Sequence, residues 1–253
     1  MIKFLYNIYQ IVFCVPVIVI SLIICTIFIV IGTRFGNANY WAYHPGRIWS
    51  KITIRSLFLP VKVEGRENIN ENDSYVFVSN HQGAFDIFLI YGYLNKNFKW
   101  LMKYQLFKIP FLGTSCRACK HIPVDKRSPR KIKETYDTAR EFLKHGMSVV
   151  LFPEGARTFT GHMGSFKRGG FLLADELQLP VVPLTINGSF NVKPRTNDMG
   201  FVNRHQLTLT IHKPIYPTGK GPENVKMLME KSYEEIQKAL VPEYQGYVEN
   251  PDQ

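Results

Sequence analysis

No charged residue stands between Lys3 and Arg34. Inside that interval, residues 8–31 are almost wholly apolar, and about 20 such residues are enough to cross the hydrocarbon core of a bilayer. The alternative is a buried core helix, but soluble helices of this length rarely lack a polar face. The stretch is too long for a signal-peptide core and has no clear small-residue cleavage site. It therefore predicts an N-terminal membrane-associated helix, in which Pro16 marks either a kink or a return to the side of entry.

Aromatic and basic residues mix in the next stretch, from Tyr40 to Arg55. Its three cations stand four residues apart, so a helix would place them on one face, and three aliphatic residues form an apolar flank. Rings beside cations are typical of the lipid headgroup layer, although a solvated basic helix is the alternative. Positive charge after an apolar segment predicts that the following body lies on the cytoplasmic face of the cell membrane. The cations are Arg47, Lys51 and Arg55, and the flank is Ile48, Ile52 and Leu59.

Short β-branched runs alternate with helical patterns across the rest of the chain. Alternating strands and helices predict an α/β fold, with a layered mixed or largely parallel sheet flanked by helices. No long linker divides this part, so residues 60–253 are predicted to form one domain behind an anchor of residues 1–59. The expected strands are Val61–Glu64, 74–79, 99–102, Ile122–Val124, 148–152, 181–186 and Leu207–Ile211, and the expected helices are 87–94, Pro129–Lys144, 171–177 and 223–239.

The chain is strongly basic: 31 Lys and Arg against 20 Asp and Glu give a net charge of +11. That surplus suits anionic partners such as nucleic acid, anionic lipid headgroups, phosphorylated substrates or an acidic carrier. Two of the four cysteines, Cys14 and Cys25, lie in the apolar N-terminus, which argues against a secreted disulfide framework. Cys116 and Cys119 form a lone C-x-x-C beside His121 with no second ligand pair, so ordinary packing is favoured over a metal or redox site.

The segment from Asn80 to Asp86 is the strongest candidate for chemistry. His81 leaves a predicted strand, Asp86 enters a predicted helix, and Gly83 between them permits a tight turn. This setting can bring the carboxylate onto one imidazole nitrogen and leave the other nitrogen facing a cleft, which is the arrangement of a general base. The alternative is a loop histidine beside an aspartate that only caps the helix.

A second candidate is Phe152-Pro153-Glu154-Gly155-Ala156-Arg157, where a predicted strand ends in a glycine turn. Backbone N–H groups and a guanidinium in such a turn can bind a phosphate. The alternative is a surface turn whose charged side chains are solvated.

In order along the chain stand N-H-x4-D, K-x-x-L-x-x-x-P-x-x-G, F-P-E-G-x-R and the Pro-flanked strand Val181-Val182-Pro183-Leu184. This series resembles the 1-acylglycerol-3-phosphate O-acyltransferases, the lysophosphatidic acid acyltransferase family, over roughly residues 60–215. The resemblance implies that His81 and Asp86 are the catalytic pair. It also implies that Lys103, Lys126 and Arg157 hold the acceptor's phosphate, with Glu154 and Gly155 shaping the phosphate-binding turn.

The implied reaction moves a fatty acyl group from acyl-CoA or acyl-carrier protein to the free hydroxyl of lysophosphatidic acid. The thioester is a co-substrate, so neither a cofactor nor a metal is implied, and no H-E-x-x-H is present. Membrane lipids are the expected partners. A nucleic-acid binder is disfavoured because no zinc finger, RNP-like motif or basic repeat occurs.

Three positions depart from the family pattern. Gln105 replaces an acid, Ala156 replaces a threonine, and Lys126 replaces an arginine, which loses bidentate phosphate geometry. These changes leave open an O-acyltransferase that acts on an ornithine- or glycine-type aminolipid. A lipid esterase is disfavoured because no G-x-S-x-G is present. A non-enzymatic basic membrane-associated protein is the alternative from another class.

Overall fold

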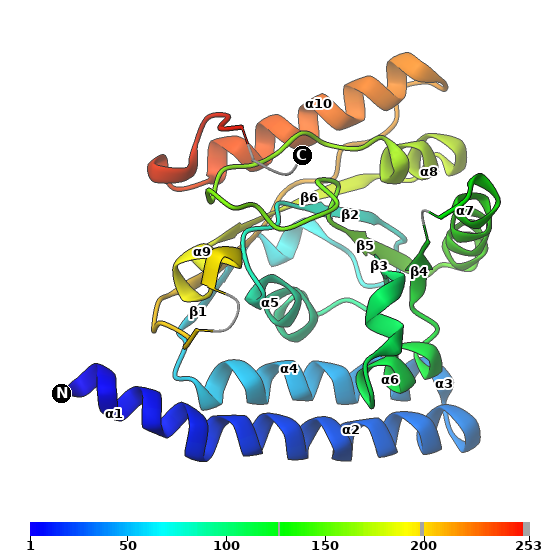
Figure 1. Cartoon of the computed structure of the whole chain (residues 1–253). Coiled ribbons are helices and arrows are strands. Elements are labelled where there is room, and N and C mark those ends of the chain that lie inside the picture. The colour runs from blue at the N-terminus through cyan, green and yellow to red at the C-terminus, as the bar shows by residue number, and fades with distance from the viewer. Residues whose placement is uncertain (126, 198–199, 250–253) are drawn as a thin grey trace.

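A seven-stranded sheet organises the body of the protein (Figure 1). The computed structural model describes residues 1–125, 127–197 and 200–249. The strands lie in the order β1-β7-β6-β2-β5-β3-β4, and neighbours are parallel except for β6 and β7, which are antiparallel. The predicted α/β fold with a mixed, largely parallel sheet is confirmed. The strands are β1 Val61–Glu64, β2 Val76–Ser79, β3 Phe98–Lys103, β4 Ile122–Val124, β5 Ser148–Leu151, β6 Val181–Asn187 and β7 Leu207–Ile211.

Helices cover both faces of the sheet. Successive residues of a strand point to opposite faces, so Val76 and Val78 pack into one core while Phe77 packs into the other. The Val76 side is covered by α7 Pro129–Lys144, α8 Gly169–Leu177 and α10 Pro222–Ala239; the Phe77 side is covered by α5 Phe85–Tyr93 and then α4 His44–Ser56. The remaining short elements are α3 Ala38–Trp41, α6 Leu112–Ala118, α9 Ser189–Val192, η2 Arg66–Asn68, η3 Tyr104–Lys108, η4 Arg195–Asn197 and η5 Pro242–Tyr244.

The N-terminal segment is one long helical rod with a defect near its start. It consists of α1 Ile2–Tyr9, a π-helical turn η1 Gln10–Cys14 and α2 Val15–Phe35. Pro16 is the second residue of α2, one residue after the π turn, and its ring nitrogen has no hydrogen to donate to the helix, so a defect at this point is expected. The 34 residues are long and apolar enough to cross a membrane, judged by length and composition.

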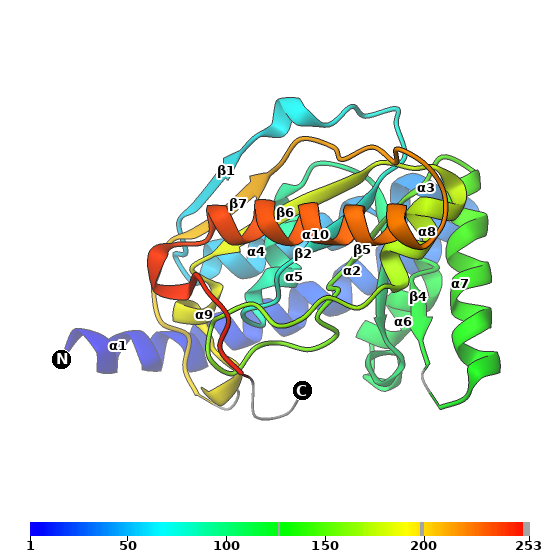
Figure 2. The same cartoon turned by 90° about the horizontal axis from the view of Figure 1, so that it is seen from above.

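Helix α2 lies along the body beside α4, whereas α1 extends past the body at the N-terminal end (Figures 1 and 2). Near the start of the rod, the Gln10 side chain donates to the Val202 carbonyl at 3.0 Å and accepts from the Val202 N–H at 2.9 Å. Further along, Thr26 Oγ1 lies 2.8 Å from Ser115 Oγ in α6. The rod is therefore held to the body at well-separated points.

Helix α4 lies between α2 and α5, and Ile54 and Leu57 at its end are buried in the core. The predicted apolar flank needs one correction. Leu59 lies beyond the last helical residue, Ser56, because the chain turns at Phe58 with a positive φ of 51°. Leu59 packs in the core of the body instead of lying on the surface of the helix.

Candidate functional site

The loops that carry the candidate residues meet at one edge of the sheet. Strands β6, β2, β5 and β3 are mutually parallel, so their carboxyl ends lie together. His81 follows β2, Glu154 follows β5, and Lys103 ends β3. In open α/β sheets this edge is where ligands bind.

His81 and Asp86 form the hydrogen-bonded pair that the sequence predicts. His81 Nδ1 lies 2.7 Å from Asp86 Oδ2, and that oxygen also accepts from the Gly83 N–H at 2.9 Å. Asp86 lies in the first turn of α5 and its side chain is fully buried, whereas the His81 side chain is 13% exposed. The carboxylate therefore fixes the ring from the protein side while the ring keeps some access to solvent.

The orientation of the imidazole is also set by stacking. The His81 ring lies parallel to the Phe152 ring, with centroids 3.8 Å apart, and Phe152 stacks in turn on Trp100. A carboxylate on Nδ1 favours the tautomer that carries its proton there. Nε2 then has the free lone pair that a general base needs.

Glu154 is buried behind the histidine and holds its backbone. Its Oε1 accepts from the His81 N–H at 2.7 Å, and its Oε2 accepts from the Gly164 N–H at 2.8 Å. The turn that follows Glu154 also contacts the His81 backbone, since the Thr158 N–H donates to the His81 carbonyl at 2.9 Å. Both oxygens of Glu154 are engaged by backbone N–H groups, so it contributes to the predicted phosphate-binding turn by shaping it and not as a ligand of the phosphate. Glu154 is a positioning residue that shapes the turn.

The environment of Glu154 leads to a pH-dependence prediction. Burial raises the pKa of this carboxyl to about 8, although the two N–H donors act in the opposite direction. The folded protein therefore holds the proton more tightly than the unfolded chain does. The resulting contribution to stability is present at low pH and is lost as the pH rises through about 8.

We expect Glu154→Gln to remove this pH dependence and to lower the free energy of unfolding by about 1–3 kcal/mol. The glutamine NH₂ is a donor, so one of the two backbone N–H groups loses its acceptor. Denaturant unfolding of the full chain in detergent between pH 5 and pH 8 measures both effects, with the exposed Glu230→Gln as the matched control. Equal pH slopes in wild type and Glu154→Gln would contradict the prediction.

Gly155 is required by the geometry of the turn. Its φ is +79°, a conformation that favours glycine, and a Cβ there would stand 2.8 Å from Lys167 Nζ. The predicted turn-shaping role of Gly155 thus has a physical basis, and the glycine also allows a lysine amine to approach the backbone.

Four cations gather next to the histidine turn. Burial lowers the pKa of Lys103, and the charges of Arg195, Arg157 and Lys167 lower it further. Arg195 Nη1 donates to the Arg157 carbonyl at 3.1 Å, and its guanidinium lies 3.9 Å from the centroid of the Phe159 ring. A strand-like bridge between Gly83 and Pro194 brings this loop against the histidine turn. We call Lys103, Arg157, Lys167 and Arg195 the cation cluster.

Two members of the cation cluster, Lys103 and Arg157, were predicted, whereas Lys167 and Arg195 were not. Lys167 follows the recognised F-P-E-G-x-R block by ten residues, and Arg195 lies beyond the last block. Neither belongs to a spaced motif. The signals in the sequence are weak: Lys167 stands two residues before a glycine pair, and Arg195 follows a proline.

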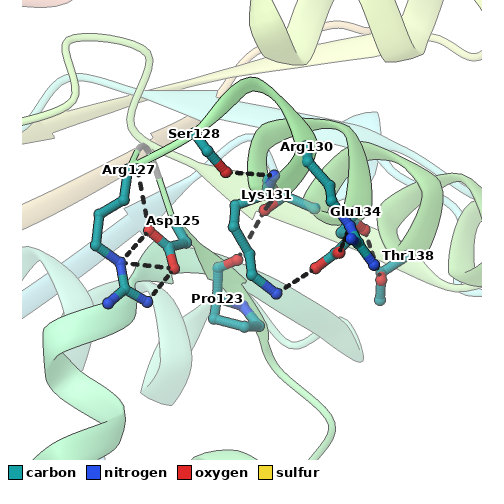
Figure 3. A network of polar contacts seen from close by, with 9 residues as sticks. Pro123, Asp125, Arg127, Ser128, Arg130, Lys131, Glu134 and Thr138 are labelled. Carbon is teal, nitrogen blue, oxygen red and sulfur yellow. Dashed lines mark hydrogen bonds and ion pairs between the residues drawn. The ribbon is translucent and has the colours of Figure 1, made fainter.

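The predicted phosphate ligand Lys126 lies outside the described residues. Its neighbours form an ion pair at the start of α7 (Figure 3). Arg127 Nε and Nη2 donate to Asp125 at 2.5–3.0 Å, and the Arg127 guanidinium lies 4.8 Å from the centroid of the Tyr104 ring. This pairing lowers the pKa of Asp125 to about 2. The charge of Arg127 is therefore balanced by Asp125.

The C-x-x-C segment is buried and shows no sign of reactivity. It contains Cys116 and Cys119 and is followed by His121. Burial raises the pKa of the Cys116 thiol to about 11 and that of Cys119 to about 12, and lowers the pKa of His121 to about 3. The His121 ring accepts the Trp100 N–H at 3.3 Å. Across the described part of the chain, no three His, Cys, Asp or Glu side chains gather as a metal site would require.

Comparison with known proteins gives the same picture. The family model described as Acyltransferase matches residues 60–187. A chloroplastic 1-acyl-sn-glycerol-3-phosphate acyltransferase of Arabidopsis thaliana is 36% identical over 171 residues, which are 67% of this chain and 47% of that protein. A 1-acyl-sn-glycerol-3-phosphate acyltransferase of Pseudomonas aeruginosa is 31% identical over 68% of this chain and 65% of its own length. The match thus spans about half of the plant relative.

A solved structure is similar over nearly its whole length. The crystal structure of the 1-acyl-sn-glycerophosphate acyltransferase PlsC from Thermotoga maritima superposes with a TM-score of 0.77 at 25% sequence identity. The likeness covers 94% of this chain and 98% of that one, so it extends beyond the sheet into the N-terminal rod.

Proposed function

Because the chain belongs to the acyltransferase family, we propose that it transfers a fatty acyl group from a thioester to the free hydroxyl of 1-acylglycerol-3-phosphate, making phosphatidic acid. The observation that carries this proposal is the position of the His81–Asp86 pair, which shares one sheet edge with the cation cluster. The pair supplies a base for a hydroxyl, and the cations supply a binding site for a phosphate.

The proposed reaction needs only residues of this chain and its two substrates. His81 Nε2 takes the proton of the acceptor hydroxyl while the oxygen attacks the thioester carbonyl. The new ester C–O bond forms, the C–S bond breaks, and the proton on His81 goes to the leaving thiolate. Asp86 stabilises the imidazolium between these two transfers. No acyl-enzyme forms, because the attacking oxygen belongs to the acceptor.

The cation cluster favours a phosphate-bearing acceptor over an ornithine- or glycine-type aminolipid. A phosphate monoester carries close to two negative charges at neutral pH, which suits several converging cations. An aminolipid headgroup lacks that charge density and brings an amine of its own. The acyl donor in this proposal is acyl-CoA or acyl-carrier protein, both of which present the same thioester.

A thiol-release assay tests the proposed function directly. The full chain in phospholipid vesicles receives an acyl-CoA, or alternatively an acyl-carrier protein, together with one acceptor at a time. We expect thiol release with lysophosphatidic acid and much less with lyso-ornithine lipid or lysophosphatidylcholine. Release with the aminolipid alone would contradict the proposed acceptor, and no release with any acceptor would contradict the activity.

We further propose that the rod lies in one leaflet of the cell membrane, with the body on the cytoplasmic face. The rod is about 50 Å long, more than the bilayer core, yet it contacts the body from Tyr6, which donates to the Leu57 carbonyl, to Ile29, which packs with Cys119. The cations in the last turn of the rod and after it, from Arg34 to Arg55, favour the cytoplasmic side. A membrane-impermeant amine reagent should modify Lys3 from the same side as the body; reaction of Lys3 only from the opposite side would show a crossing helix.

A further inference from the structure

An exposed apolar tip projects between η3 and α6. It consists of residues 109–111, which we call the tip. Ile109 is 45% exposed and Phe111 is 47% exposed, and Pro110 between them is exposed as well. Three adjacent apolar residues in water are unfavourable in a protein surrounded by solvent on all sides.

The backbone at Phe111 is strained, and a side chain at this position increases the strain. Phe111 has a φ of 59° and a ψ of −55°, and the Leu112 N–H donates to the Pro110 carbonyl at 2.6 Å. This is a γ-turn of the rare, strained form. Glycine would adopt it more readily than phenylalanine. A bulky ring at such a position indicates that the ring itself is needed, since strain of this kind concentrates in functional segments.

The tip is continuous with the membrane-associated rod. Ser115 of α6 contacts Thr26 of α2, and one turn later Cys119 packs against Ile29. Phe111 precedes α6, and its carbonyl accepts from the Ser115 N–H at 2.9 Å, so the tip adjoins the residue that contacts α2. The neighbouring exposed residues of α2 are apolar: Ile20, Ile24, Ile27 and Phe28.

The residues around the tip resemble the edge of a membrane-binding surface. Lys108 precedes the tip, with its amine 5.5 Å from the centroid of the Tyr104 ring. Arg117 and Lys120 are exposed on the other side of α6 and at its end. An apolar projection bordered by aromatic and basic residues suits lipid tails below and anionic headgroups above.

We propose that the tip inserts into the lipid surface beside α2. Because η3 joins the tip directly to Lys103, insertion sets the depth of the cation cluster at the headgroup layer, where a lysolipid phosphate lies. This last step rests on the proposed function, whereas insertion of the tip does not.

The insertion is measured with an environment-sensitive label on the full chain. Ile109→Cys is labelled with a nitrobenzoxadiazole dye, because the native cysteines are all buried. The protein is reconstituted in phosphatidylcholine–phosphatidylglycerol vesicles that contain lipids with a nitroxide on the acyl chain. Ile27→Cys on α2 is the positive control. Tyr216→Cys is the negative control, because Tyr216 is 62% exposed and lies next to the amino end of β6, at the opposite end of the strands from the tip. We expect quenching at 109 close to that at 27; quenching no stronger than that at 216 would overturn the proposal.

A second experiment measures acyl transfer and distinguishes an effect of the tip on membrane binding from an effect on the reaction itself. In Ile109→Ser/Phe111→Gly the strained φ is relieved, so we expect no loss of thermal stability. Transfer to a long-chain acceptor in vesicles should fall about tenfold in kcat/KM, since up to two apolar anchors are lost, while transfer to a short-chain soluble acceptor is unchanged. An equal loss with both acceptors would show that the tip acts on the body. If no acceptor supports transfer in the wild type, the proposed function fails, and the labelling result still decides the tip.

Discussion

Replacing His81 by alanine is expected to lower kcat by about 10²-fold or more while the protein remains folded and membrane-bound. The reason is that the ring accepts the proton of the acceptor hydroxyl, and no other base in the described turn is held by a buried carboxylate at 2.7 Å. Asp86→Asn should also lose much of the activity, because the amide cannot stabilise the imidazolium. Single-turnover thiol release in vesicles measures both variants.

His205→Ala is the matched control for this experiment. His205 is exposed and its ring forms a hydrogen bond with the neighbouring Gln206 carbonyl, so its loss should leave kcat unchanged. Far-UV circular dichroism and flotation with liposomes check the fold and membrane association of each variant. Near-normal turnover in a folded His81→Ala protein would contradict the proposed general-base mechanism.

Arg157→Gln and Arg195→Gln are each expected to raise KM for the acceptor by about tenfold or more, with little change in KM for the acyl donor. Hydrogen bonds to charged groups contribute about 1.5–3 kcal/mol, and both guanidinium groups belong to the cation cluster. Arg195→Lys should recover part of the loss, because it keeps the charge but not the planar fork. Initial rates with each substrate varied separately give the two KM values.

Arg204→Gln controls for the change in net charge. It lies on the same loop as Arg195, is exposed, and donates to the Phe58 carbonyl away from the cation cluster. We expect it to leave both KM values unchanged. If Arg157→Gln or Arg195→Gln raised the donor KM and left the acceptor KM alone, the two substrate sites would be the reverse of our assignment.

The sequence revealed the parts of this protein whose information is local. His81 and Asp86 are five residues apart across one strand–helix turn, so their pairing could be predicted from the segment itself. The strands β1, β4 and β7 and the helix α7 were predicted with the bounds that the structure has, because apolar periodicity and turn residues mark both ends of each.

The contacts that could not be predicted from the sequence depend on which strands become neighbours. The hydrogen bond from the His81 N–H to Glu154 joins residues 73 positions apart, and it exists because β2 pairs with β5. Strand order does not follow from periodicity, so the contact of Glu154 with the His81 backbone could not be predicted. Arg195 reaches the site through the bridge between Pro194 and Gly83, which is equally non-local.

The Gln10–Val202 pairing constrains the order of events during synthesis. The two residues are 192 positions apart, and a ribosome that adds about 5–20 residues per second needs about 10–40 seconds to make the chain between them. Throughout that interval the apolar rod has emerged but its partner loop does not yet exist. Lipid offers a large apolar environment during that time, so the rod is expected to enter the membrane first. The body then completes its folding against a helix that is already in the membrane. The last long-range contacts of the protein, such as Gln10 with Val202, therefore form at the bilayer surface.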